Sequence, residues 1–247
     1  MPEAYRNPSI RELLLPLSQQ GSGAALNLVA DSAGSWCVGK DQYWLPRIVY
    51  RGAGETGEPY IELAIFAGVH GDEPAGVEAL IDLLRYMKEQ PDLFRAYRIH
   101  IYPLCNPTGF EDGTRHSRSG KDLNREFWRG SAEPEVQILE RELLAKKFHG
   151  IISLHSDDTS DGLYGFVRGH VLTEQLLEPA LAAAEAALPV NQAAVIDGFH
   201  AVNGIIRTGY EGILGAPPES SPAPFEIVLE SPTHAPMDLQ RRSFVLE

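Results

Sequence analysis

Two motifs in the sequence carry side chains that bind divalent metal ions. His70 and Glu73, in the motif HGDE, are three residues apart and directly precede a predicted helix, so they project from one face of its first turn. His155 ends a short apolar segment, residues 151–154. Two histidines and one glutamate are suitable zinc ligands that leave a fourth position open for water. Alone, the first motif is more typical of a surface loop, and a lone histidine at a strand end is usually structural or exposed. Together the two motifs predict a catalytic metal site.

A buried acid is predicted at the end of the last apolar segment, residues 225–229. Glu230 closes this segment, and an acid in such a place is costly unless it is paired or used. It could serve as a general base that takes a proton from water activated by a metal ion. Glu226 is the alternative, because strand alternation puts it on the same face. Glu230 is preferred because it lies at the carboxyl end of the strand.

A basic loop, residues 115–125, stands out in a chain with a net charge of −13. It contains Arg115, Arg118 and Arg125. Guanidinium groups bind carboxylates with two hydrogen bonds and stabilise developing oxyanions. The alternative is a solvated basic loop without a function. The motif NPTG that precedes this loop has the composition of a turn.

The elements that would position these residues alternate between strands and helices. Strands are predicted at 60–67, 97–104, 151–154, 163–168 and 225–230, and helices at 74–87, 134–148 and 171–188. A further strand at 44–50 is predicted to form a hairpin with 60–67. The alternation predicts an α/β fold, a three-layer α/β/α sandwich with a mixed, mostly parallel central sheet. The polar motifs follow strand ends, where ligands bind in such sheets.

Length and composition limit the class of protein. The 247 residues, 43% apolar and 22% charged, are typical of one globular domain spanning 1–247, with 1–45 as an irregular segment that includes a short helix at 10–15. The acidic balance disfavours nucleic acid as a partner. No segment has the length and apolarity of a membrane span or the pattern of a signal peptide, and there are only two cysteines. We therefore expect a cytoplasmic protein without a membrane partner; the sequence does not indicate its oligomeric state.

The ordered set of motifs resembles the zinc metallocarboxypeptidase superfamily, the carboxypeptidase A-like M14 group. This superfamily includes the murein-peptide amidases and the succinylglutamate desuccinylase/aspartoacylase branch. The resemblance is strongest over residues 60–235 and rests on HGDE, NPTG, the spacing from Arg115 to Arg125 with DLNR at its end, EPE, SLH and VLESP. It implies the same fold that the alternation predicts.

The resemblance assigns a role to each residue near the metal. His70, Glu73 and His155 correspond to the ligands of one zinc ion, for which cobalt or manganese is an alternative. Asp122 corresponds to an acid that orients the first histidine. Glu230 corresponds to the general base, which later returns its proton to the leaving nitrogen.

Other matched residues concern the substrate. Arg115 corresponds to the arginine that stabilises the oxyanion, and Asn124 and Arg125 to the pair that binds the free carboxylate of the substrate. Peptidases of this group also use a tyrosine upstream of the general base, and here the pattern departs from theirs. Tyr210 and Tyr164 are the candidates, with a packed or rim aromatic as the alternative for each.

These roles predict a zinc-dependent hydrolase that cleaves an amide bond next to a free carboxylate. NPTG, EPE and the short chain after Glu230 favour a carboxypeptidase or peptide amidase acting on small peptides. The alternatives are an N-acyl amino acid deacylase of the succinylglutamate desuccinylase/aspartoacylase type and a non-catalytic zinc-binding pseudoenzyme. Asp157, Asp158 and Asp161 form either a solvated acidic loop or a contact for an amine of the substrate.

Overall fold

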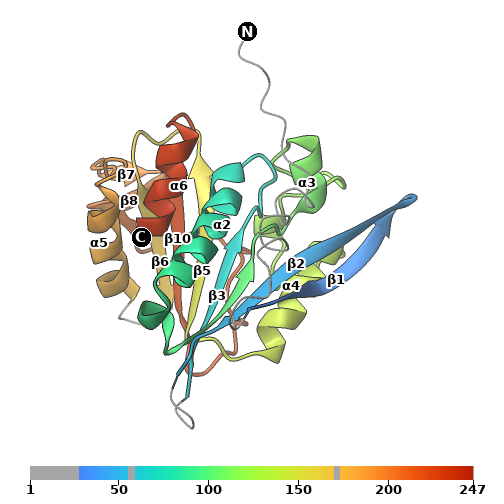
Figure 1. The fold of residues 1–247 in the computed structure, drawn as a ribbon. Helices are drawn as coiled ribbons and strands as arrows, with labels where there is room; N and C mark the ends of the chain where they lie inside the picture. The colour runs from blue at the N-terminus through green and yellow to red at the C-terminus, as the bar shows by residue number, and fades with distance from the viewer. Residues whose placement is uncertain (1–27, 55–58, 170–172, 247) are drawn as a thin grey trace.

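The described part of the chain folds around one sheet (Figure 1). The computed structural model describes residues 28–54, 59–169 and 173–246. The strands are β1 (Leu28–Val38), β2 (Asp41–Arg51), β3 (Ile61–Ala67), β4 (Tyr97–Tyr102), β5 (Gly150–Asp157), β6 (Tyr164–Gly169), β7 (Val195–Ile196), β8 (Phe199–Val202), β9 (Ile205–Ile206) and β10 (Phe225–Pro232). The helices are α2 (Pro74–Glu89), α3 (Pro107–Asp112), α4 (Pro134–Ala145), α5 (Thr173–Ala184) and α6 (Met237–Leu246), with 3₁₀ turns η1 (Pro91–Phe94) and η2 (Leu123–Arg125).

The strands of the described residues lie in the order β1-β2-β4-β3-β5-β10-β6-β9-β8-β7. The central strands β4, β3, β5 and β10 are parallel, whereas β1, β2 and β6 pair antiparallel with their inner neighbours. Helices α2, α5 and α6 cover one face and α4 covers the other, which gives three layers (Figure 1). The predicted mixed α/β/α sandwich is therefore confirmed.

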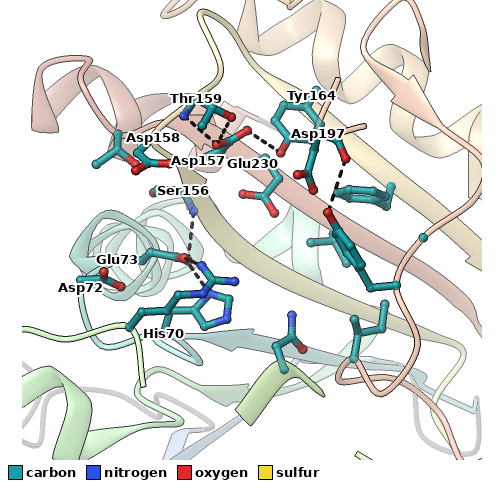
Figure 2. Close-up of a pocket in the computed structure, with 18 of the residues that line it drawn as sticks. His70, Asp72, Glu73, Ser156, Asp157, Asp158, Thr159, Tyr164, Asp197 and Glu230 are labelled. Atoms are coloured by element: carbon teal, nitrogen blue, oxygen red, sulfur yellow. Dashed lines mark hydrogen bonds and ion pairs between the residues drawn. The ribbon is translucent and has the colours of Figure 1, made fainter. Parts of the chain in front are cut away.

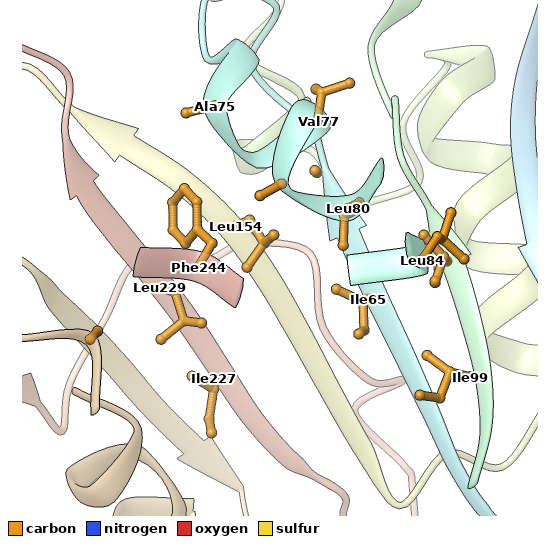
Figure 3. Packing of buried hydrophobic residues seen from close by; sticks show 14 of the residues in the cluster. Ile65, Ala75, Val77, Leu80, Leu84, Ile99, Leu154, Ile227, Leu229 and Phe244 are labelled. Carbon is orange, nitrogen blue, oxygen red and sulfur yellow. The ribbon is translucent and has the colours of Figure 1, made fainter. Parts of the chain in front are cut away.

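The larger apolar core lies between the sheet and α2, α5 and α6 (Figure 3). Leu80 and Leu84 of α2 pack with Ile65 of β3 and Leu154 of β5, and each is nearly inaccessible to solvent. The helical spacing of the apolar residues of α2 places most of them on this face. Each such side chain contributes about 1.5–3 kcal/mol of transfer free energy, so this layer fixes α2 and the HGDE loop that precedes it.

The predicted hairpin between residues 44–50 and 60–67 is wrong. Strand β4 lies between β2 and β3 and pairs with both. The connection, residues 52–60, is longer than the two to about five residues that usually join hairpin strands. Strand β2 forms its hairpin with β1 instead.

The predicted irregular segment 1–45 is wrong from Leu28 onward, because β1 and the start of β2 lie there. The β1–β2 turn contains Gly39, whose φ of 63° favours glycine. Strand β1 is mostly exposed, so it lacks the apolar alternation that indicates a strand. The helix predicted at 10–15 lies outside the described residues. None of the described helices is long and apolar enough to cross a bilayer.

Candidate functional site

A pocket of about 430 Å³ opens at the carboxyl ends of the parallel strands (Figure 2). Strands β3, β5 and β10 end beside it, as expected for a ligand site in a parallel sheet. Its polar and charged lining residues are His70, Asp72, Glu73, Arg115, Asn124, Arg125, Ser156, Asp157, Asp158, Thr159, Tyr164, Asp197, Tyr210, Thr233 and Glu230. The pocket thus collects most of the residues that the sequence singles out, and His155 and Asp122 lie behind its lining, in contact with His70.

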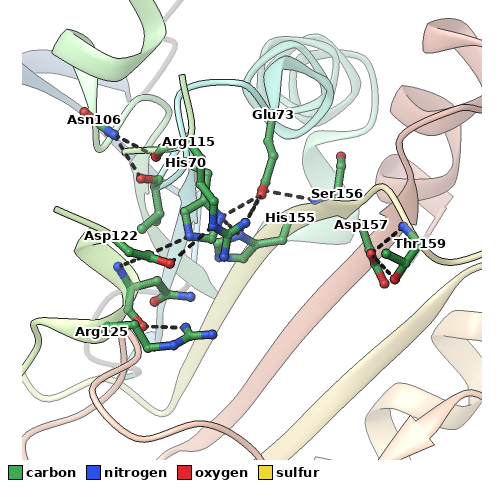
Figure 4. Close-up of polar contacts among 12 residues, drawn as sticks. His70, Glu73, Asn106, Arg115, Asp122, Arg125, His155, Ser156, Asp157 and Thr159 are labelled. Carbon is green, nitrogen blue, oxygen red and sulfur yellow. Dashed lines mark hydrogen bonds and ion pairs between the residues drawn. The ribbon is translucent and has the colours of Figure 1, made fainter. Parts of the chain in front are cut away.

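The three predicted metal ligands converge at one side of the pocket (Figure 4). Their ligand atoms all lie within 4.8 Å of one another, and all three side chains are buried. His70 Nδ1 lies 2.6 Å from Glu73 Oε1, and His155 Nδ1 lies 2.9 Å from Glu73 Oε2. The two Nδ1 atoms are 3.2 Å apart. A cluster of lone-pair donors in this arrangement fits a cation, and two imidazoles with one carboxylate suit zinc.

The charges around this cluster hold it together electrostatically. Glu73 and Asp122 raise the pKa of His70 to about 9, although burial alone would lower it. His70 and His155 hold the pKa of Glu73 well below its usual range, although burial alone would raise it. Burial lowers the pKa of His155, which favours the neutral imidazole that ligates metals. Among the described residues, His155 Nε2 has no hydrogen-bond partner.

The HGDE loop is held against the NPTG segment by a close backbone contact. Asn106 caps α3 through its side chain, which accepts a hydrogen bond from the amide of Gly109 at 2.9 Å. A Cβ on Gly71 would lie 2.0 Å from the carbonyl carbon of Gly109. Two glycines therefore let the metal-ligand loop approach α3, which gives the NPTG motif a structural role.

Asp122 lies where the predicted orienting acid should lie. Its Oδ1 is 3.0 Å from His70 Nε2, and its Oδ2 accepts a hydrogen bond from Arg115 Nε at 3.2 Å. Arg115 also reaches Glu73 at 3.4 Å. The ring nitrogen of His70 that faces away from the metal position is thus held by a carboxylate, and that contact fixes the ring orientation.

Glu230, the predicted general base, is half-buried on the pocket floor beside the metal ligands. It stands opposite His155 in the parallel register of β10 and β5. Burial, together with the charges of Glu73, Asp157 and Asp197, raises its pKa well above the usual range. Glu226 is not among the pocket-lining residues; its carboxylate accepts a hydrogen bond from the Ala216 amide at 2.6 Å.

Asn124, Arg125 and Tyr210 form the opposite side of the pocket. The side-chain oxygen of Asn124, Oδ1, accepts a hydrogen bond from the backbone amide of Leu214 at 2.8 Å. The side-chain NH2 group of Asn124 therefore points in another direction. The Arg125 guanidinium lies over the Tyr210 ring, 4.0 Å from its centroid. The Tyr210 hydroxyl donates to the Asp197 backbone carbonyl at 3.4 Å. These residues lie where a substrate carboxylate could be bound.

The acidic residues after His155 are divided between pocket and surface. Asp157 lines the pocket, and its carboxylate accepts hydrogen bonds from Thr159 and from the Tyr164 hydroxyl (Figure 2). Tyr164 is buried, and its only polar side-chain group donates this hydrogen bond to Asp157. Asp158 also lines the pocket, whereas Asp161 is fully exposed and lies outside it.

Asp197 is the pocket residue that sequence reasoning missed. It lies in the two-residue turn between β7 and β8, where Asp197 and Gly198 both have positive φ, 50° and 78°. The next turn repeats the pattern with Asn203 and Gly204, at 51° and 72°. Asp-Gly and Asn-Gly are the strongest short signals for such hairpins. The segment DGFHAVNG, residues 197–204, thus contained the sequence signal for the two hairpin turns at this edge of the sheet.

A comparison of sequences decides the family. The profile for the succinylglutamate desuccinylase/aspartoacylase catalytic domain matches residues 59–198, more than half of the chain. The chain belongs to this family. The matched range includes the three candidate metal ligands, Arg115 and Arg125. Membership in the succinylglutamate desuccinylase/aspartoacylase family confirms the predicted resemblance, because that branch lies within the superfamily. It also confirms that this is a metallocarboxypeptidase-like catalytic domain.

Other relatives carry peptidase names. Carboxypeptidase D of Anas platyrhynchos is 36% identical over 92 residues, which are 31% of this chain and only 6% of that protein. A crystal structure from Shewanella baltica, classed provisionally as a metallopeptidase, has a TM-score of 0.75 at 25% identity and covers 96% of this chain and 89% of its own. A metallo-carboxypeptidase from Burkholderia cenocepacia has a TM-score of 0.69 at 17% identity, with 96% and 66% covered; this likeness shows the fold alone.

Proposed function

We propose that this protein is a zinc-dependent hydrolase that cleaves an amide bond next to a free carboxylate in small peptides, as a carboxypeptidase or peptide amidase. The observation that carries the proposal is one pocket lined by a half-buried acid, two arginines, and His70 and Glu73 of the His-Glu-His cluster. A zinc ion held by His70, Glu73 and His155 would supply Lewis-acid activation of water and of the scissile carbonyl.

The protein's own residues supply the remaining steps. Glu230 takes the proton from the attacking water and gives it to the leaving nitrogen. Arg115 stabilises the negative charge on the carbonyl oxygen. Asn124 and Arg125 bind the carboxylate and so orient the scissile carbonyl toward the metal ligands. A non-catalytic pseudoenzyme would have no need of this complete set.

The charges in the pocket favour a peptide over an N-acyl dicarboxylic amino acid. Asp72, Asp157, Asp158 and Asp197 line it in addition to the catalytic acids, against two arginines. N-succinylglutamate carries three carboxylates, which these acids would repel. A peptide with one free carboxylate and a neutral or cationic remainder is a better match.

Deacylation of an N-acyl amino acid remains the second candidate because the family match favours it. The zinc-loaded protein should be incubated with a pool of short peptides, murein-type peptides and N-acyl amino acids, beside Glu230→Gln, and the products read by mass spectrometry. We expect release of a C-terminal residue or peptide fragment by the wild type alone. Consumption of N-acyl amino acids only would favour the deacylase, and activity retained in Glu230→Gln would reject Glu230 as the base.

The carboxylate contact is tested separately with Arg125→Ala. This variant should raise KM for peptides with a free carboxylate by about tenfold, the effect of about 1.4 kcal/mol, and leave peptides with an amidated end unchanged. An equal loss on both kinds of peptide would reject the proposed carboxylate contact.

A further inference from the structure

A buried polar network joins the last helix, α6, to the strand ends that carry the site. The Gln240 side-chain oxygen accepts hydrogen bonds from the Ser231 hydroxyl at 3.0 Å and the Ser156 hydroxyl at 3.4 Å. Its nitrogen donates to the backbone carbonyls of Thr233 at 3.1 Å and Ala235 at 2.7 Å. Both donors and both lone pairs of the amide are used, and Gln240 is only 3% exposed.

Each serine of this network directly follows a residue of the site. Ser156 follows His155 on β5 and Ser231 follows Glu230 on β10, and the parallel register sets each pair opposite the other. The two hydroxyls are 3.0 Å apart. The Ser156 amide also donates to Glu73 Oε2 at 3.1 Å. One side chain of α6 thus connects both strand ends, and through Ser156 it reaches a metal ligand.

We infer that Gln240 is a positioning residue, which fixes the ends of β5 and β10 and thereby the placement of His155, Glu73 and Glu230. This inference rests on the proposed function of the same pocket. A buried amide with four partners holds one arrangement, because any shift leaves a polar group unsatisfied at a cost of about 1–3 kcal/mol. A displacement of about 1 Å at a catalytic group is enough to lower a rate by about a hundredfold.

The network should affect the chemical step more than substrate binding. Asn124 and Arg125, the proposed carboxylate contacts, both belong to η2, and the Asn124 side chain is held by the Leu214 amide. Gln240 makes its hydrogen bonds at the carboxyl ends of β5 and β10, next to His155 and Glu230. A change at Gln240 is therefore expected to lower kcat and metal affinity while KM stays nearly constant.

The test compares Gln240→Met with Phe244→Leu. Methionine has a similar length but no hydrogen bonds, whereas Phe244 belongs to the same helix and packs in the apolar core (Figure 3). The readouts are the zinc dissociation constant by competition with a chromophoric chelator, the visible spectrum after cobalt substitution, and kcat and KM. For Gln240→Met we expect zinc affinity to fall at least about tenfold, the cobalt spectrum to change, and kcat to fall at least about tenfold. Phe244→Leu should lower the melting temperature without these effects.

The metal readouts separate this inference from the proposed function, because they need no substrate. If the wild type cleaves no amide but Gln240→Met still has a reduced zinc affinity, the proposed function is rejected and the positioning role of Gln240 is retained. If Gln240→Met does not fold, the same zinc and cobalt measurements are made on Ser231→Ala, which removes a single hydroxyl of the network. Zinc affinity and cobalt spectrum equal to those of Phe244→Leu would overturn the inference.

Discussion

Arginines and acids both line the pocket. Arg125 lies on one side of His155, and Asp157 lies on the other (Figure 4). Asp197 is an acid of the pocket whose carboxylate is exposed to solvent. A short peptide has the complementary distribution, with a carboxylate at one end and an ammonium group at the other. The free amino group of a dipeptide is therefore expected to lie near Asp197.

Asp197→Asn tests this contact. A charge-assisted hydrogen bond to an ammonium group is worth about 1.5 kcal/mol, and less where solvent screens it. We expect kcat/KM for a dipeptide with a free amine to fall about three- to tenfold, while its N-acetylated counterpart is unaffected. Asp161→Asn is the control, because Asp161 is fully exposed and outside the pocket. Equal rate changes for both substrates would reject the contact.

The candidate site was predictable to the extent that its residue types are specific. His70, Glu73 and His155 follow apolar segments, and the metal cluster follows from their chemistry and from the sheet edge they share. Asp197 was not predictable in this way, because an acid in a turn is ordinary and its place depends on which sheet edge the turn reaches. Gln240 gave no signal at all, since its role depends on the packing of α6 against distant strands.

At the scale of elements, the HGDE loop depends on its contact with α3. Gly71→Ala would place a Cβ 2.0 Å from a backbone carbon of Gly109, so the loop or α3 must move. We expect zinc affinity to fall at least about tenfold and the melting temperature to fall. Gly209→Ala is the matched control, because its Cβ would have a nearest neighbour at 3.5 Å. Unchanged zinc affinity in Gly71→Ala would show that the loop is free to adjust.

The first turn of α4 contains an acid that lowers stability at neutral pH. Glu135 is buried, and burial raises its pKa to about 7. Among the described residues its Oε2 has no hydrogen-bond partner. In the unfolded chain the pKa is about 4.3, so the folded state binds more protons between these values. The contribution of Glu135 to stability is therefore most favourable below about pH 4 and becomes less favourable as the pH rises toward 7, by at most about 4 kcal/mol.

Glu135→Gln removes this pH dependence. The variant should be nearly as stable as the wild type at about pH 4, and its advantage should grow up to about pH 8. Urea unfolding at a series of pH values gives the difference in free energy of unfolding. An advantage that is constant with pH would mean that Glu135 is not protonated in the folded protein.

The helices and central strands could be predicted because their signals are local. The apolar spacing of α2 and the apolar runs of β3 and β10 each indicate an element and its buried face. The partners of β2 could not be predicted in the same way, because pairing depends on contacts between distant residues. Strand β4 separates β2 from β3 although it follows both in the chain.

At the scale of the whole molecule, the described residues share one continuous sheet. It connects the β1–β2 hairpin at one edge to the metal ligands on β5 and beside β3. The three tryptophans, Trp36, Trp44 and Trp128, belong to β1, β2 and the segment before α4. Their fluorescence therefore reports a part of the protein that contains none of the metal ligands, which allows the single-domain prediction to be tested.

If the protein is one domain, zinc should stabilise the tryptophan region as much as the site itself. Free zinc at about a thousand times its dissociation constant stabilises the folded state by about 4 kcal/mol, which raises the melting temperature of a chain of this size on the order of 10 °C. Tryptophan fluorescence, far-ultraviolet circular dichroism and zinc release should then show one coincident transition. A tryptophan transition that zinc does not shift would mean that the β1–β2 region unfolds separately, because only cooperative unfolding transmits the free energy of metal binding to residues that do not contact it.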